Sequence, residues 1–208
     1  MPAPLAILGT GVFAEEVADL VEQSDEHEVV AFVENWNRER AGGELAGRPI
    51  VWVDELGGHA GEWRAVCAIA SPERRAYVEH VAGLGIEFAT VVHPTAVVSP
   101  SARLGSGCVV SPRVVVGSHT EIGEHAIVNR GVLIGHHTRV GSCVTISPGA
   151  NIAGCVEIGD GAYIGMGATV IDRRAIGDGA LVAAGAVVVK DVAAGQRVQG
   201  VPARAVER

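Results

Sequence analysis

The chain has 208 residues, of which 48% are hydrophobic and only 4% aromatic, and its formal net charge is −8. An acidic balance without a basic run argues against nucleic acid as a partner, because proteins hold phosphates mainly with Lys and Arg. The chain contains no apolar stretch of about 18 residues, so we expect no membrane span.

The N-terminal part alternates apolar runs with helical patterns. The predicted elements are a strand over residues 5–8 that ends in Gly9-Thr10-Gly11, a helix over 12–21, a strand over 28–33 that ends at Glu34-Asn35, a strand over 65–70, a helix from about Pro72 to Leu84, and a last strand over 87–92. Strands that alternate with helices predict a parallel sheet with crossover connections.

The glycine-rich turn after the first strand, with an acid at the end of the second, is typical of a Rossmann-like domain. Backbone N–H groups at the start of its first helix are suited to hold a phosphate. Ala14 stands where the fingerprint usually has glycine, so a small α/β domain without a ligand is the alternative. Residues 1–92 are too few for both halves of a dinucleotide site, which argues against an NAD dehydrogenase.

His93-Pro94 opens a second region with a different pattern, so the predicted domains are residues 1–92 and 93–208. From Val98 to Val188 an aliphatic residue stands at every sixth position, sixteen times, and glycine follows it directly in eight of the sixteen hexads. A period of six fits neither a helix nor an alternating strand, and it is the signature of a parallel β-helix. We expect three hexads to close one triangular coil of 18 residues, giving about five coils.

Within each hexad, the aliphatic side chain should point inward and share the narrow core with a small or β-branched residue two positions earlier; Arg174 is the exception. The glycines, such as Gly105, Gly117, Gly135 and Gly165, are expected to take a backbone conformation that would strain other residues. Residues 18 apart should lie in one column, because stacked coils pair like strands of a sheet.

Histidines gather at the predicted corners. His119, His137 and Cys155 form one column, and His125 and Cys143 form another. His136 stacks between Ser118 and Gly154, whose small size should leave its ring accessible as a general base near neutral pH. The alternatives are a solvated surface histidine and, for the His119/His137 column, a metal site that would need a third ligand.

The four cysteines form no CxxC pair, and the first residues lack a basic segment followed by an apolar one. We therefore expect reduced thiols, no signal peptide and a cytoplasmic location.

Taken together, these motifs resemble the bacterial sugar acetyltransferases that join a small Rossmann-like domain to a left-handed hexapeptide β-helix. That group includes enzymes that acetylate UDP-linked 4-amino sugars and the sialic acid O-acetyltransferases. The residues that carry the resemblance are the Gly-x-Gly turn, Glu34-Asn35, His93-Pro94-Thr95-Ala96, the sixteen hexads, Ile134-Gly135-His136, Ser147-Pro148-Gly149-Ala150 and Gly200-Val201-Pro202-Ala203-Arg204.

The resemblance implies an α/β N-terminal Rossmann-like domain followed by a left-handed parallel β-helix. It also implies an acetyl-CoA-dependent transferase that N-acetylates an amino sugar carried on a nucleotide, as a homotrimer with active sites between subunits. His136 matches the catalytic histidine, which takes a proton as the amine or hydroxyl attacks the thioester, so no acyl-enzyme is needed. His137 stands where relatives usually carry an Asp or Glu that orients the ring, and as a neutral imidazole it would accept a hydrogen bond but raise basicity less.

By the same resemblance, the residues expected to contact acetyl-CoA are Thr145, Gly154, Met166, Ala184, Pro202 and Arg204; Thr145 stands where relatives have a histidine near the acetyl group. The residues expected to bind the sugar nucleotide are Thr10, Gly11, Val12, Glu34, Asn35, Ala70 and Ser71. No metal is expected as a cofactor.

Departures from the family pattern leave the exact activity open. Gly11-Val12-Phe13 replaces the usual first loop, and Glu34-Asn35 replaces a paired aspartate, which leaves the acceptor sugar and its carrier undefined. O-acetylation of a sugar or of sialic acid would use the same base. A zinc-dependent lyase on the same β-helix is a second possibility, and a trimeric scaffold without activity is a third.

Overall fold

The computed structural model describes residues 2–71 and 73–206, and the chain divides into two compact units, Met1–Pro94 and Thr95–Arg208. The domain boundary expected between residues 92 and 93, with a different function on each side of it, stays a prediction. No helix among the described residues is long and apolar enough to cross a bilayer.

The N-terminal unit is built on one sheet with the order β3-β4-β2-β1-β5-β6. Its strands are β1 (Ala3–Leu8), β2 (His27–Glu34), β3 (Glu44–Leu45), β4 (Arg48–Trp52), β5 (Arg64–Cys67) and β6 (Glu87–Phe88). Every neighbouring pair is parallel except β3 with β4. The carboxyl ends of β1, β2, β4 and β5 therefore meet at one edge, where ligands bind in folds of this kind.

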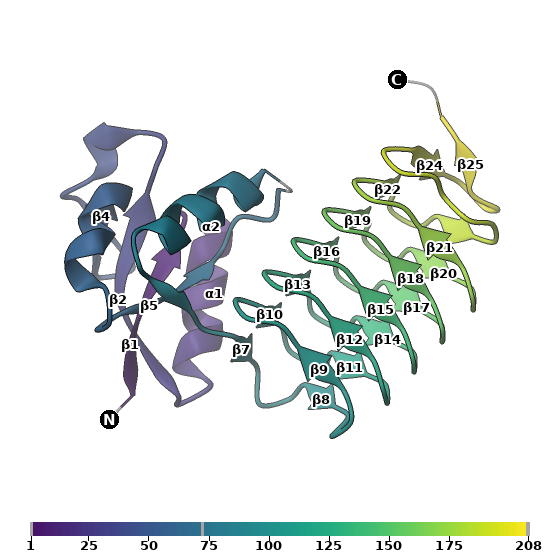
Figure 1. Ribbon diagram of the computed structural model, residues 1–208, viewed down its shortest axis with the longest axis horizontal. Coiled ribbons are helices and arrows are strands. Elements are labelled where there is room, and N and C mark those ends of the chain that lie inside the picture. Colours follow the sequence, from purple (N-terminus) through teal and green to yellow (C-terminus); the bar gives the residue numbers. More distant parts are fainter. Residues whose placement is uncertain (1, 72, 207–208) are drawn as a thin grey trace. The chain divides into compact units, whose positions relative to one another are not determined.

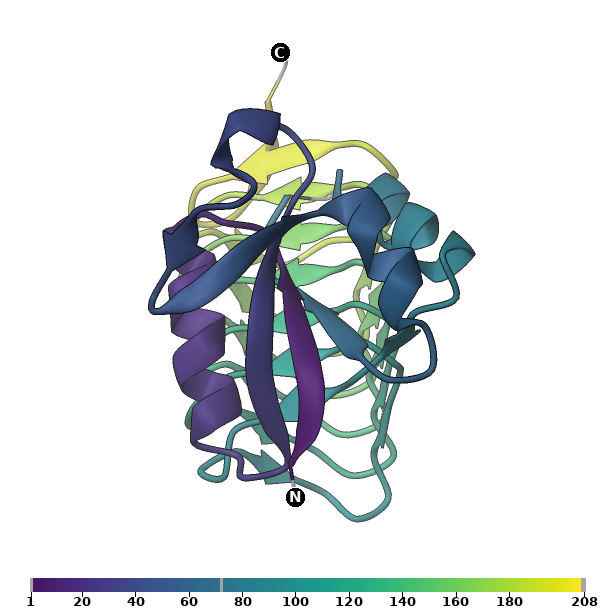
Figure 2. The same ribbon diagram turned by 90° about the vertical axis from the view of Figure 1, so that its left-hand side faces the viewer.

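Two α-helices lie on opposite sides of this sheet (Figure 2), α1 (Val12–Glu22) and α2 (Arg74–Gly83). The buried face of α1 consists of Ala14, Val17, Ala18, Leu20 and Val21, which is the spacing of an amphipathic helix. The 3₁₀ helices η1 (Arg38–Arg40) and η2 (Val53–His59) follow β2 and β4.

Several N-terminal predictions need correction. The strand predicted over residues 65–70 ends at Cys67, because only its first half has a pairing partner along β1. The strand predicted over 87–92 is split into β6 and β7 (Val91–Val92), since β6 is an edge strand that pairs with just two residues of β5. The second helix begins at Arg74; its predicted start, Pro72, lies outside the described residues.

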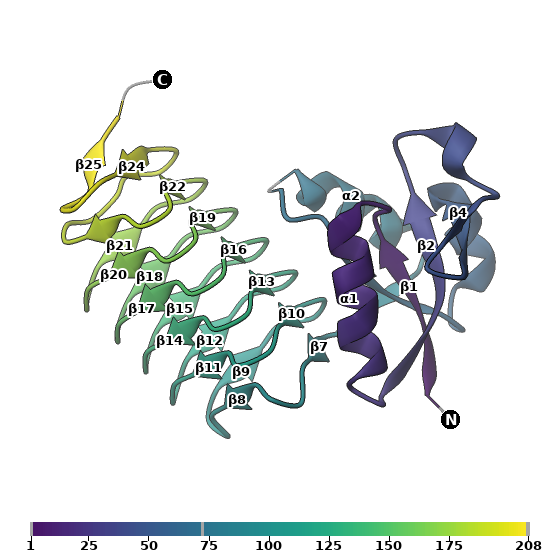
Figure 3. The same cartoon turned by 180° about the vertical axis from the view of Figure 1, so that it is seen from behind.

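The C-terminal unit is a stack of triangular coils (Figures 1 and 3). Its sixteen hexads form sixteen two-residue strands: β8 (Val97–Val98), β9 (Arg103–Leu104), β10 (Val109–Val110), β11 (Val115–Val116), β12 (Glu121–Ile122), β13 (Ile127–Val128), β14 (Leu133–Ile134), β15 (Arg139–Val140), β16 (Thr145–Ile146), β17 (Asn151–Ile152), β18 (Glu157–Ile158), β19 (Tyr163–Ile164), β20 (Thr169–Val170), β21 (Ala175–Ile176), β22 (Leu181–Val182) and β23 (Val187–Val188). The chain then ends in the antiparallel pair β24 (Arg197–Gln199) and β25 (Arg204–Ala205).

From β8 to β20, each strand pairs in parallel with the strand three hexads later, so partners are 18 residues apart, as with Val115 and Leu133. The first face carries β8, β11, β14, β17, β20 and β23, the second face β9, β12, β15, β18 and β21, and the third face β10, β13, β16, β19, β22, β24 and β25. Inward aliphatic residues such as Ile146 and Ile164 are fully buried, and the small residues Ala150 and Ala168 share their core. The predicted fold class, a Rossmann-like domain followed by a left-handed parallel β-helix, is confirmed.

The reason expected for the glycine that follows the aliphatic residue in eight hexads is wrong. Gly135 does not have a positive φ; instead, a Cβ built on it would lie 2.5 Å from the carbonyl carbon of Ala153 and the nitrogen of Gly154 in the next coil. This glycine is therefore required by the close approach of stacked backbones. The left-handed conformation lies two residues further on, at His137 with φ +55°.

Candidate functional site

A cluster of histidines lies at one corner of the β-helix, between the first and second faces, which we call the first corner. His136 and His137 follow β14, and His119 follows β11 one coil earlier. Both His119 and His137 have φ values in the left-handed region, +57° and +55°. The rings of His119 and His137 lie 4.8 Å apart, as the 18-residue column predicts.

His136 and His137 are joined through their ring nitrogens. Nδ1 of His136 lies 3.1 Å from Nδ1 of His137, and the rings meet nearly edge to face at 84°. In such a bond one Nδ1 carries the proton and the other accepts it. If His136 is the donor, its Nε2 holds the free lone pair that a general base needs.

The ring of His136 lies over Gly154. A Cβ added to Gly154 would be 2.8 Å from Cε1 and Nε2 of His136, so the absence of a side chain there leaves room for the ring. His136 is also exposed to solvent. The structure thus confirms that the ring is accessible and lies against a small residue.

The residues expected to contact acetyl-CoA lie at separate places on one chain. Gly154 shares the first corner with His136, whereas Met166 and Ala184 follow β19 and β22 at the corner after the third face. Met166 is 58% exposed, and Thr145, on the third face, is only 2% exposed. One copy of the β-helix therefore does not bring Thr145 beside His136.

Pro202 and Arg204 lie near the C-terminal end, and both are exposed. The guanidinium of Arg204 donates a hydrogen bond to the carbonyl of Ala203 at 3.0 Å.

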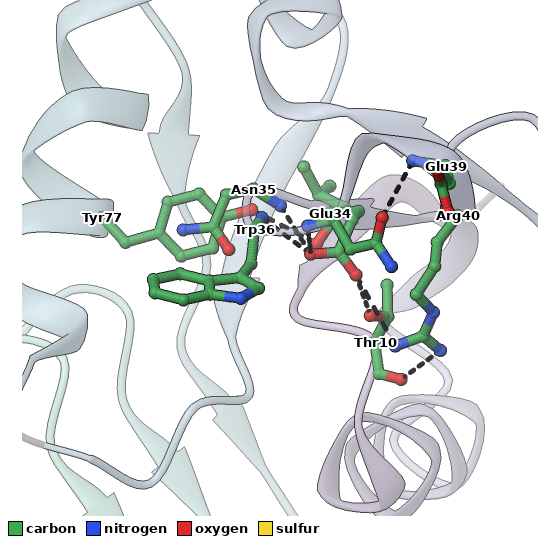
Figure 4. Close-up of polar contacts among 9 residues, drawn as sticks. Thr10, Glu34, Asn35, Trp36, Glu39, Arg40 and Tyr77 are labelled. Carbon is green, nitrogen blue, oxygen red and sulfur yellow. Dashed lines mark hydrogen bonds and ion pairs between the residues drawn. The ribbon is translucent and has the colours of Figure 1, made fainter.

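At the carboxyl edge of the N-terminal sheet, Glu34 collects a set of donors (Figure 4). One carboxylate oxygen accepts a hydrogen bond from the Thr10 hydroxyl and lies 3.6 Å from the Arg40 guanidinium. The other accepts from three successive backbone N–H groups, of Asn35 at 3.0 Å, Trp36 at 2.8 Å and residue 37 at 3.2 Å. Arg40 also donates to the carbonyl of Thr10 at 2.9 Å.

Both Thr10 and Glu34 are buried, at 8% and 6% exposure. Burial alone would raise the pKa of Glu34, but the hydrogen bonds from Thr10 and from the backbone of residues 35–37 outweigh it and lower the pKa. These two residues, expected to touch the substrate, are therefore engaged with each other. They shape the loops after β1 and β2 in place of offering free polar groups.

Of the remaining expected substrate residues, Gly11 precedes α1 as its N-cap without a side-chain cap, and Val12, the first helical residue, is 86% exposed. Nothing lies within 4 Å of a Cβ placed on Gly11, so the helix start is open to a ligand. Asn35 and Ala70 are exposed, and Ser71 is partly exposed. These residues follow β1, β2 and β5, so the sheet brings them to one edge.

The sequence reasoning missed a pocket of about 560 Å³ at this edge, whose lining includes Trp36, Trp52, Asp54, Tyr77 and His80. In the sequence, the signal for this pocket is Trp36, which stands two residues after Glu34 at the end of β2.

No group of three or more His, Cys, Asp or Glu side chains in residues 2–71 and 73–206 is arranged to hold a metal ion. None of the four cysteines forms a disulfide, and Cys67, Cys108 and Cys143 are buried.

Two family profiles match the chain. Residues 4–80 match the PglD N-terminal domain, and residues 137–172 match the bacterial transferase hexapeptide repeat. Comparison with curated protein sequences finds no match.

Solved structures similar to the chain include three that match nearly its whole length. A variant of perosamine N-acetyltransferase from Caulobacter crescentus, with one histidine replaced by asparagine and in complex with CoA and GDP-perosamine, is 31% identical over 99% of this chain and 98% of its own, with a TM-score of 0.92. The acetyltransferase domain of PglB from Neisseria gonorrhoeae is 31% identical over 98% and 99%, with a TM-score of 0.89. WeeI from Acinetobacter baumannii is 29% identical over 98% and 100%, with a TM-score of 0.88.

Proposed function

The chain belongs to the bacterial sugar acetyltransferases that join a PglD-type N-terminal domain to hexapeptide repeats and is therefore an acyltransferase, and we propose that it transfers an acetyl group from acetyl-CoA to the amine of a nucleotide-linked amino sugar. The perosamine enzyme, which matches nearly the whole chain, is an N-acetyltransferase with CoA and a nucleotide sugar bound. This similarity favours N-acetylation over O-acetylation. The observation that carries the proposal is the geometry of His136.

His136 acts as the general base. The amine nitrogen attacks the thioester carbonyl while Nε2 of His136 takes the proton that the nitrogen loses. The carbon–sulfur bond then breaks, and His136 returns the proton to the leaving thiolate of CoA. Histidine suits this exchange because it both accepts and releases a proton near neutral pH. The same type of residue is replaced in variants of the perosamine enzyme.

His137 positions this base. The two Nδ1 atoms lie 3.1 Å apart, so a neutral His137 that accepts a hydrogen bond from Nδ1–H of His136 keeps His136 in the tautomer with a free Nε2. When His136 becomes an imidazolium, its charge strengthens the same bond. An imidazole thus takes the place of the Asp or Glu that the family resemblance implies at this position.

We propose that the acetyl-CoA site forms between copies of the chain in a homotrimer. His136 and Gly154 lie at the first corner, but Met166 and Ala184 lie at the corner after the third face, and Thr145 lies on that face. A second copy is needed to bring the two sets together. Val97, Val115 and Leu133 form an apolar column on the first face and are 40–62% exposed, which suits a subunit contact.

Small and apolar residues at both corners suit the pantetheine arm of CoA. Pro202 and Arg204 are proposed to cover one end of it, with the Arg204 guanidinium available to a phosphate. Because acetyl-CoA and nucleotide sugars are cytoplasmic metabolites, we propose that the enzyme acts in the cytoplasm.

The N-terminal unit is proposed to bind the nucleotide. The open start of α1 at Gly11 and Val12 offers N–H groups to a phosphate. Asn35, Ala70 and Ser71 line the neighbouring loops, and the buried Thr10–Glu34 pair keeps the loop after β2 in shape.

The test is thiol release from acetyl-CoA with a panel of UDP-, GDP- and dTDP-linked 4-amino sugars and sialic acid, with the His136→Ala variant as the matched blank. We expect release with an amino sugar and a product that resists hydroxylamine, as an amide does. A hydroxylamine-labile product would identify an O-acetyltransferase. Absence of acetyl-CoA binding would overturn the proposal that acetyl-CoA is the donor.

A further inference from the structure

The pocket at the carboxyl edge of the N-terminal sheet has an aromatic lining that none of the assigned substrate residues explains. Its volume is about 560 Å³, and its walls come from the loop after β2, the start of η2, and α2. The parallel sheet brings these three segments together next to the open start of α1, which is where folds of this type hold nucleotides.

Trp36 provides an open stacking surface. Its side chain is 91% exposed, although its backbone N–H is fixed by Glu34 at 2.8 Å. Figure 4 shows the indole and the Asn35 amide on the side of Tyr77, away from Thr10 and Arg40. Tyr77 is buried and its hydroxyl donates to the carbonyl of Val33 at 3.2 Å, so it forms a fixed wall. An exposed indole beside a fixed aromatic wall suits a flat heterocycle.

Two carboxylates supply hydrogen-bond acceptors to the lining of the pocket. The Asp54 carboxylate accepts from Nε1 of Trp52 at 3.1 Å and lies 3.1 Å from Nε2 of His80, and each oxygen keeps a further lone pair. Its side chain is 64% exposed. Glu73 adds a second carboxylate to the lining.

The buried arginine of the pocket is held by backbone carbonyls. Arg74 is 1% exposed, and its guanidinium donates to the carbonyls of Ile69 at 3.5 Å and Ser71 at 3.0 Å. It holds the loop after β5 in place. The pocket therefore favours a planar group that donates hydrogen bonds, and it disfavours a phosphate.

We propose that this pocket binds the nucleobase of the sugar carrier and selects guanine, an inference that rests on the proposed function. The base stacks on Trp36, and its N1–H and 2-amino group donate to Asp54. Uracil and thymine would turn carbonyl oxygens toward the carboxylate, since each has one N–H between two carbonyls. Adenine would turn its unprotonated N1 toward Asp54, so guanine is the best match among the common bases.

The test is calorimetric binding of GDP, ADP and UDP to the full chain, without any chemistry. We expect GDP to bind about tenfold or more tightly than UDP, the size of a good bidentate base contact. Asp54→Asn should weaken GDP by about tenfold and leave UDP unchanged or improved. Glu55→Gln, an exposed neighbour in η2 outside the pocket lining, is the matched control and should leave all three affinities unchanged.

Trp36→Ala should weaken all three nucleotides by about tenfold, since stacking does not depend on the identity of the base. Tighter binding of UDP than of GDP, or equal loss of GDP and UDP in Asp54→Asn, would overturn the choice of guanine and leave the transferase proposal intact. Absence of binding by every nucleotide would overturn the nucleotide carrier itself, and this proposal with it.

Discussion

The buried carboxylate of the N-terminal unit and the histidine pair of the β-helix differ in how many of their polar atoms are bonded within the protein. Both oxygens of Glu34 are taken up by hydrogen bonds from Thr10 and three backbone N–H groups, and by the ion pair with Arg40. His136 has one nitrogen bonded to His137 and its other edge exposed over Gly154. A group whose hydrogen bonds are all made within the protein stabilises the fold. A group with one nitrogen exposed to solvent can exchange a proton with a substrate.

Removing the exposed ring nitrogen of His136 should have the largest effect on activity. We expect His136→Ala to lower turnover by about 10²–10⁴, the usual contribution of a general base. Because the side chain is exposed, thermal unfolding should change little. Thiol release and a melting curve measured together check this, and undiminished turnover in the variant would show that His136 is not the general base.

Removing the Glu34 carboxylate, whose two oxygens are both hydrogen-bonded, should mainly lower stability. Glu34→Ala leaves the Thr10 hydroxyl and three N–H groups without their acceptor, so we expect the free energy of unfolding of the N-terminal unit to fall by about 3 kcal/mol. Tryptophan fluorescence during urea unfolding reports this unit alone, because the three tryptophans are Trp36, Trp52 and Trp63.

The exposed Glu39→Ala, in the same loop, is the control for that measurement and should leave the transition in place. Equal urea midpoints for Glu34→Ala and Glu39→Ala would show that Glu34 does not stabilise the unit more than an exposed residue does.

Two glycines allow the β-helix to be tested in the same way. Gly135→Ala puts a methyl group 2.5 Å from backbone atoms of the next coil, so we expect a loss of about 1–3 kcal/mol in stability, followed by circular dichroism. Gly154→Ala puts its methyl group nearest to the His136 ring, at 2.8 Å, so the ring should shift and turnover should fall while stability stays within about 0.5 kcal/mol. Equal stabilities of the two variants would contradict the backbone-contact argument.

The orienting role of His137 predicts a smaller effect. His137→Gly removes the acceptor at a position with φ +55°, where glycine is favourable, so folding should be preserved. We expect kcat to fall roughly tenfold with little change in KM, the equivalent of about 1.4 kcal/mol for one hydrogen bond. His137→Asn, which tolerates this φ and has an acceptor oxygen, should recover part of the loss.

His125→Gly removes a histidine with the same φ of +55° at another corner and should leave kcat unchanged. A similar fall of kcat in both glycine variants would attribute the effect to the backbone instead of the hydrogen bond.

The smallest expected effect is on the pH dependence of stability. The pKa of Glu34 is lowered in the folded chain from its ordinary value of 4.5, so its contribution is complete above that pH and is lost as the pH falls through the folded pKa. Urea midpoints from tryptophan fluorescence at decreasing pH should therefore fall below about pH 4.5, and Glu34→Gln should flatten this part of the curve. An unchanged slope in the variant would contradict the lowered pKa.

How far the sequence predicts each region depends on the distance between contacting residues. In the β-helix, stacking partners from β8 to β23 are 18 residues apart, so the period of six predicts the sixteen strands and the placement of His136 over Gly154. The period does not predict why glycine is required at these positions, since the spacing of stacked backbones is a property of the folded coil.

The N-terminal unit has no such repeat. β4 was missed because Arg48 and Pro49 interrupt its apolar pattern, and its place is determined by pairing with β2. The contact of Thr10 with Glu34 spans 24 residues and depends on the register of β1 and β2. Residue types at the sheet edge were predictable from the sequence, but which of them bond to each other was not.

The 18-residue spacing of the coils has a consequence for how such a chain can change in length. Adding or deleting one whole coil returns every later residue to the same face, so a change of this size alters the height of the stack and preserves its corners. Inserting a single residue would turn every later aliphatic side chain out of the core. Viable lengths of the β-helix therefore come in discrete steps of one full turn.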